Sequence, residues 1–65
     1  MQISLNGEKV ESERQTLMEL ILGTGLDPAS VVAEVNLKVI RQNSWTKITI
    51  NEGDDIELLS FVGGG

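Results

Sequence analysis

The chain contains no cysteine and no histidine among its 65 residues. Without cysteine it has no disulfide framework and no thiol chemistry of its own. Without histidine it lacks the commonest general base and metal ligand of proteins. We therefore expect no metal site, no bound cofactor and no enzymatic activity that this chain performs by itself.

Basic residues are also scarce, since five lysines and arginines stand against ten acidic residues and give a net charge of −5. Nucleic acids and anionic membranes require the opposite balance, so neither is an expected partner. The charge favours a partner protein with a basic face, although acidity also promotes solubility. The apolar runs are short, and because strand-like alternation begins at once we expect no secretory leader. We expect one cytoplasmic domain, monomeric when alone.

The N-terminal part predicts a hairpin followed by a helix. Residues 2–5 alternate polar and apolar side chains, Asn6-Gly7 is typical of a tight two-residue turn, and residues 8–13 predict the return strand. Residues 16–19 form a capping box, which begins a helix with an apolar face. We expect Gly23 to end this helix in the left-handed conformation.

The second half contains further strand patterns. Residues 27–28, Asp-Pro, predict a single helical turn, and residues 31–35 alternate as in a half-buried strand. Residues 37–40 either continue that strand past a kink or form a short partner strand. Trp45 is expected to be tucked against the sheet, and residues 48–50 predict another short strand.

Residues 51–54 predict a turn before the last strand, residues 56–62. The order of elements predicts an α+β fold of the β-grasp class, with a mixed sheet of four to five strands and one crossing helix. The last strand should lie centrally, parallel to the first. We assign residues 1–62 to the domain and residues 63–65 to a flexible tail. The predicted inner face of the sheet includes Ile3, Leu5, Val31, Ala33, Val35, Ile56 and Leu58.

The last strand has an unusual outer face. Glu57 marks this face as solvated, yet Leu59 and Phe61 lie on the same side because strand residues alternate. Two large apolar side chains on a solvated face predict a docking patch, unless the sheet curls and loop residues cover them. We predict that Leu59 and Phe61, together with Val62, contact a partner protein.

Three glycines, Gly63, Gly64 and Gly65, follow this strand directly. Glycine has no side chain to bury and loses the most conformational freedom on ordering, so folding does not require three of them here. One interpretation is a frayed terminus. The other is a thin tail that enters a narrow channel of another protein, reaching about 10 Å beyond Val62.

Together these features resemble the thiamine-biosynthesis sulfur carrier family, a ubiquitin-like β-grasp family. The resemblance covers essentially the whole chain, and the glycine end on a domain of this length is its most specific feature. One departure is Arg41-Gln42, where members often have Pro-Arg, and we assign Arg41 no role. The remaining matching segments are Met1-Gln2-Ile3, Asn6-Gly7-Glu8, Thr16-Leu17 with Leu20-Ile21, Val32-Ala33-Glu34-Val35-Asn36, Trp45, Gly53-Asp54, Ile56-Glu57 and Phe61-Val62.

The resemblance implies a carrier protein whose chemistry takes place on the terminal carboxylate of Gly65. An adenylating enzyme of the kind that activates ubiquitin would join this carboxylate to AMP from ATP. A persulfide sulfur donor would displace the AMP, and the resulting thiocarboxylate would give its sulfur to thiazole synthase. Gly63 and Gly64 would provide access for the tail, and the partner enzymes would supply the catalysis.

Three other functions stay open from the sequence. The small subunit of molybdopterin synthase has the same fold and the same reactive end, though it is usually longer. Another sulfur carrier, or a protein modifier that forms isopeptide bonds, would also use the glycine tail. A pure interaction module would leave it unmodified. Intact mass separates these classes, because sulfur carriage exchanges one oxygen for sulfur and conjugation adds a whole protein.

Overall fold

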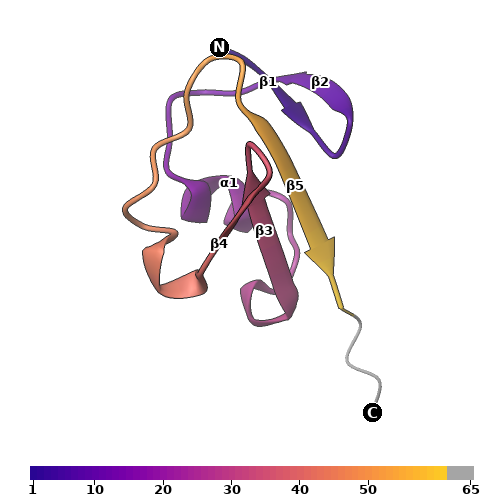
Figure 1. The fold of residues 1–65 in the computed structure, drawn as a ribbon, viewed down its shortest axis with the longest axis vertical. Coiled ribbons are helices and arrows are strands. Elements are labelled where there is room, and N and C mark those ends of the chain that lie inside the picture. The colour runs from indigo at the N-terminus through magenta and orange to yellow at the C-terminus, as the bar shows by residue number, and fades with distance from the viewer. Residues whose placement is uncertain (62–65) are drawn as a thin grey trace.

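Five strands and one helix follow the pattern of the sequence. The computed structural model describes residues 1–61, whose arrangement is shown in Figure 1. The elements are β1 (Gln2–Leu5), β2 (Glu8–Glu11), α1 (Leu17–Gly23), a 3₁₀ turn (Pro28–Ser30), β3 (Val31–Val35), β4 (Lys38–Ile40), a second 3₁₀ turn (Gln42–Ser44) and β5 (Asp55–Ser60).

The strands form one mixed sheet in the order β2-β1-β5-β3-β4. β5 lies in the centre and parallel to β1, as predicted, and it pairs antiparallel with β3 on its other side. The sheet and the single helix are consistent with the predicted β-grasp fold. Residues 37–40, for which two outcomes were open, contribute the short partner strand β4.

The helix begins where the capping box predicts. The hydroxyl oxygen of Thr16 accepts a hydrogen bond from the Glu19 amide at 3.2 Å, and the Glu19 carboxylate accepts one from the Thr16 amide at 2.9 Å. These two bonds satisfy amides that have no partner within the helix. The core combines the apolar face of α1 with one face of the sheet and one connecting segment: Ile3, Leu17, Leu20, Ile21, Val31, Ala33, Trp45, Ile50, Ile56 and Leu58. Leu5 and Val35, predicted for the same face, are partly buried against it.

Trp45 completes the core from the long connection between β4 and β5. Its side chain is 1% exposed, and its indole N–H donates a hydrogen bond to the Ile40 carbonyl at 2.9 Å. The prediction that Trp45 is tucked against the sheet is therefore confirmed. The ring fills space that one seven-residue helix cannot cover by itself.

Three local predictions differ from the structure, and the first concerns the end of the helix. Gly23 is the last helical residue and has no positive φ; the left-handed glycine is Gly25, with φ of +81°. Thr24 lies between them in right-handed conformation, and its amide and hydroxyl both bond the Ile21 carbonyl, so the helix end is satisfied without a turn at Gly23.

Residues 48–50 do not form the predicted strand. Thr49 makes only an isolated bridge with Thr16, because this segment pairs with the short entry to α1 rather than with the sheet. The amide of Ile50 donates to the Gln15 carbonyl at 2.9 Å, which fixes its side chain in the core. The second strand is also shorter than predicted, ending at Glu11.

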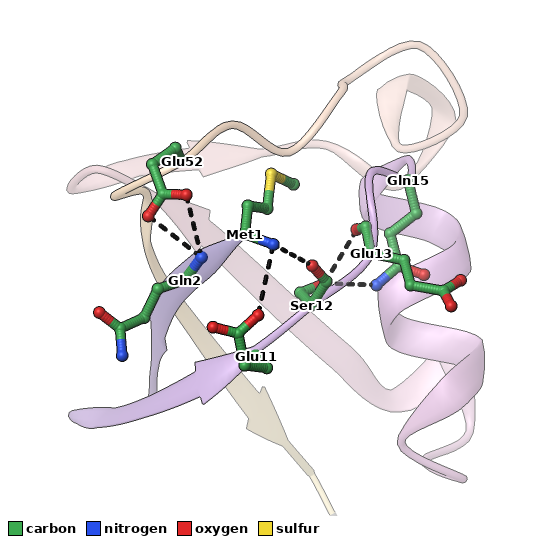
Figure 2. A network of polar contacts seen from close by, with 7 residues as sticks. All are labelled: Met1, Gln2, Glu11, Ser12, Glu13, Gln15 and Glu52. Carbon is green, nitrogen blue, oxygen red and sulfur yellow. Dashed lines mark hydrogen bonds and ion pairs between the residues drawn. The ribbon is translucent and has the colours of Figure 1, made fainter.

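The N-terminus is held at the end of the molecule opposite to the end of β5 (Figure 1). The ammonium group of Met1 donates to the Ser12 carbonyl at 2.8 Å and lies 3.4 Å from the Glu11 carboxylate. The Gln2 amide donates to both carboxylate oxygens of Glu52 at 3.1 Å (Figure 2). These contacts join the start of β1 to the segment after β2 and to the turn before β5.

The hairpin between β3 and β4 has an unusual turn. Asn36 and Leu37 both adopt positive φ, 52° and 69°, as in a two-residue turn that normally uses glycine. Asn36 is anchored, since its side chain donates to Asp54 at 3.0 Å and accepts from the Asp55 amide at 2.9 Å. Leu37 is 83% exposed, so its side chain gains little from burial in this fold.

Candidate functional site

The outer face of β5 carries exposed apolar side chains, as predicted. Leu59 is 55% exposed and Phe61 is 59% exposed, whereas Leu58, which precedes Leu59, is 5% exposed and lies in the core. Within residues 1–61 no loop buries the side chain of Leu59 or of Phe61. The structure therefore brings these two predicted site residues together on the solvated side of the sheet.

Two further residues extend this surface. Val32 on β3 lies directly opposite Leu59, and residues in direct register share one face of a sheet. Val39 on the edge strand β4 is 62% exposed and lies opposite Glu34, the next outward residue of β3. We call Val32, Val39, Leu59 and Phe61 the outer patch. The alternation of residues 31–35 already placed Val32 on this face, whereas Val39 could be assigned only after the hairpin register was known.

Acidic residues adjoin the outer patch. Glu34 lies directly opposite Glu57 in the register of β3 and β5. Within residues 1–61 the only ion pair joins the Met1 ammonium and Glu11, so neither Glu34 nor Glu57 has a cationic partner there. The surface thus combines apolar area with negative charge, which complements a partner that presents apolar and basic groups.

The backbone of β5 is fixed on both sides near this patch. On the β3 side, the Phe61 amide donates to the Ser30 carbonyl at 2.7 Å. On the β1 side, the Leu58 amide donates to the side-chain oxygen of Asn6 at 2.8 Å. Asn6 belongs to the β1–β2 turn, and its own amide donates to the Ile56 carbonyl at 2.8 Å. These hydrogen bonds therefore hold the backbone in an extended conformation from Ile56 to Phe61.

Four predicted site residues, Val62, Gly63, Gly64 and Gly65, lie outside the described residues. Their assigned roles therefore stay predictions. Among residues 1–61, no group of three or more cysteine, aspartate or glutamate side chains comes together to hold a metal ion. In the same part of the chain, no helix has the length and apolar character needed to cross a membrane.

Comparison with known proteins gives a consistent result. The model of the ThiS family matches residues 2–65. The sulfur carrier protein ThiS of Bacillus subtilis is 29% identical over 65 residues, which make up 97% of this chain and 98% of that protein. The crystal structure of the thiamine biosynthesis protein ThiS of Geobacter metallireducens superposes with a TM-score of 0.85 at 28% identity, covering all of both chains.

A longer protein also matches. The thiazole synthase of Paramagnetospirillum magneticum is 33% identical over 66 residues, covering the whole of this chain. Those residues make up 20% of the synthase, so this chain spans about one fifth of its length. A segment similar to this chain therefore occurs within a longer polypeptide named thiazole synthase.

Proposed function

The chain belongs to the ThiS family of sulfur carrier proteins of thiamine biosynthesis, and we propose that it carries its sulfur on the carboxyl group of Gly65. The observation that supports this most strongly is the match to the Bacillus subtilis carrier over nearly the full length of both chains. In this sequence three glycines follow two residues after the end of β5, where a thin tail would leave the sheet. We propose that the protein acts in the cytoplasm and that partner enzymes perform the chemical steps.

The proposed chemistry proceeds by activation and displacement. The Gly65 carboxylate attacks the α-phosphorus of ATP on an adenylating enzyme, forming an acyl adenylate and releasing pyrophosphate. The terminal sulfur of a protein persulfide then displaces AMP and forms an acyl disulfide. A thiol cleaves its S–S bond, which leaves the thiocarboxylate on Gly65 and a disulfide on the donor side. The thiocarboxylate is the form that delivers sulfur to thiazole synthase.

This chain contributes binding and reach to that chemistry. Leu59 and Phe61 would dock against the adenylating enzyme and then against thiazole synthase, together with Val62. Glu34 and Glu57 give the docking surface a charge that a basic face would match. The role of Gly63 and Gly64 is to let the tail pass where a side chain would collide. The reacting carboxylate can then approach within the ~3–3.5 Å that displacement requires.

The proposal is tested by intact mass spectrometry. The protein is incubated with ATP, the adenylating enzyme and a persulfide sulfur donor, and its C-terminal fragment is then sequenced by mass. We expect the mass to rise by the difference between sulfur and oxygen, with the change confined to Gly65. A protein lacking Gly65 is the control, and it should fold but gain little or no sulfur.

Other outcomes would assign other functions. A gain of a whole protein mass would indicate a modifier, and no change under any condition would indicate an interaction module. Equal sulfur gain by the truncated protein, or a gain at an internal residue, would refute the role of Gly65. Transfer of the sulfur to thiazole synthase, but not to molybdopterin synthase, would establish the destination.

A further inference from the structure

The end of β5 has one bare side. β5 runs past the β1–β2 hairpin toward the last described residue (Figure 1). On its other side β3 follows it to the end, since Val31 pairs with Ser60 and Ser30 accepts from the Phe61 amide. β1 pairs with β5 only as far as Ile56, and the chain then turns away at Asn6. The sheet therefore has a step at this point.

Backbone amides and carbonyls point alternately to the two sides of a strand, which identifies the groups of β5 that have no partner on the β1 side. Asp55 and Phe61 bond toward β3, whereas the Ile56 carbonyl and the Leu58 amide bond toward β1 and Asn6. The next groups on the β1 side are the Leu58 carbonyl and both the amide and carbonyl of Ser60. Within residues 1–61 no hydrogen bond to these three groups is present. They form a short, open strand edge that ends two residues before the first glycine in the sequence.

We propose that this step is a binding site for an extended segment of thiazole synthase, which adds to the sheet beside the second half of β5. The inference deepens the proposed function and rests on it. Backbone groups in a row at strand spacing are recognised by another strand, whose main chain supplies the matching donors and acceptors. The Asn6 side chain marks where the site begins, because it already occupies the Leu58 amide.

The side chains support the same occupant. A strand added here would place its outward residues beside Leu59 and Phe61, because neighbouring strands share their faces. The added strand would therefore bind the open backbone groups and would also contact Leu59 and Phe61 of the outer patch. The choice of thiazole synthase follows from the match in which a segment like this chain occurs within a thiazole synthase polypeptide. Apolar outward residues and a basic residue near Glu57 would complete the fit.

The test measures amide hydrogen exchange by NMR on the ¹⁵N-labelled full chain, alone and saturated with thiazole synthase. We expect the Ser60 amide to exchange freely in the free protein and to be slowed by about tenfold or more in the complex. The Glu52 amide, in the exposed turn before the start of β5 and away from the outer patch, is the internal control and should keep its rate. Unchanged exchange at Ser60 in a saturated complex would refute the site.

Two other outcomes would assign the edge to another occupant and overturn the proposal. Protection of Ser60 that rises with protein concentration without enzyme would indicate pairing between two copies. Protection by the adenylating enzyme but not by thiazole synthase would indicate that enzyme instead. If Ser60 is not protected while the tail still gains and transfers sulfur, the site fails and the proposed function stands. Protection of Ser60 without any sulfur gain by the tail would support the binding site and refute the proposed function.

A variant pair tests the same site through binding. Ser60→Pro removes the amide hydrogen that faces the bare side, a position where a strand tolerates proline. Ser60→Ala keeps that hydrogen and is the matched control. We expect Ser60→Pro, but not Ser60→Ala, to weaken binding to thiazole synthase by about tenfold, with sulfur loading by the adenylating enzyme retained. Equal binding of thiazole synthase by the two folded variants would contradict the proposal. If Ser60→Pro does not fold, the exchange rate of the Ser60 amide in the unsubstituted protein decides instead.

Discussion

Glu34 on β3 and Glu57 on β5 face each other directly across the centre of the sheet, and no cationic group within residues 1–61 pairs with either. Like charges in this position oppose folding. We predict that Glu57→Gln raises the free energy of unfolding by about 0.2–1 kcal/mol in low salt, and that the gain shrinks as salt screens the repulsion.

Urea denaturation at two salt concentrations measures this effect. Glu13→Gln is the control, because it changes the net charge equally at an exposed position outside the sheet. An equal gain from both variants would show that overall charge, rather than the facing pair, is responsible.

Neighbouring leucines on β5 should differ sharply in their contribution to stability. Leu58 is buried in the core, so Leu58→Ala should lower the free energy of unfolding by about 2–5 kcal/mol. Leu59 is half exposed, so Leu59→Ala should change it by only about 0.5 kcal/mol. Chemical denaturation of both variants checks the assignment, and similar losses would mean that the outer patch belongs to the core.

The outer patch should matter for binding more than for folding. Changing both Leu59 and Phe61 to serine removes apolar contacts worth at most roughly 1.5–3 kcal/mol each on docking. Calorimetric titration with the adenylating enzyme should therefore show weaker binding, while the melting temperature stays nearly unchanged. A variant that unfolds without a separate binding defect would contradict this assignment.

Gly64 should be required for access of the tail and not for folding. Gly64→Leu should give a folded protein that the adenylating enzyme modifies slowly or not at all, as followed by intact mass. Gly23→Leu is the matched control, since a Cβ added there meets no atom within 4 Å and the change leaves the tail untouched. Normal adenylation of Gly64→Leu would remove the argument for a narrow channel.

Leu37 should be replaceable with a gain in stability. Its φ of +69° is unfavourable for a side chain with a Cβ and unstrained for glycine, so Leu37→Gly should stabilise the fold by about 0.4–1 kcal/mol. Thermal unfolding tests this, with Val39→Gly in the adjoining strand as a control that should destabilise. If Leu37→Gly also destabilises, the leucine side chain makes a contribution that its 83% exposure does not indicate.

Much of this fold follows from local chemistry that the sequence displays. The capping box at Thr16 predicts where α1 begins, and the Asn6-Gly7 turn fixes the register of the first hairpin. The alternation along the predicted last strand correctly separates Leu58 from Leu59 and Phe61. These patterns succeed because each depends only on residues within a few positions of one another.

The remaining features depend on partners that are distant in sequence. The turn at Asn36 and Leu37 lacks the usual glycine, and it is held by Asp54 and Asp55 at the start of the neighbouring strand β5. The bare side of Ser60 arises because β1 ends at Leu5, which no pattern within β5 reveals. Residues 48–50 alternate like a strand, but the entry to α1 takes up their backbone bonds.

The position of Met1 determines how this protein can be handled in the experiments above. Its ammonium group lies at the end of the molecule away from the end of β5, beside Glu11 and the Ser12 carbonyl. An affinity tag joined there would turn the ammonium into an amide, which can still donate to Ser12 but no longer carries a charge beside Glu11. A purification handle therefore belongs at the N-terminus, with a short spacer, where it leaves unblocked the carboxyl group that we propose to carry sulfur.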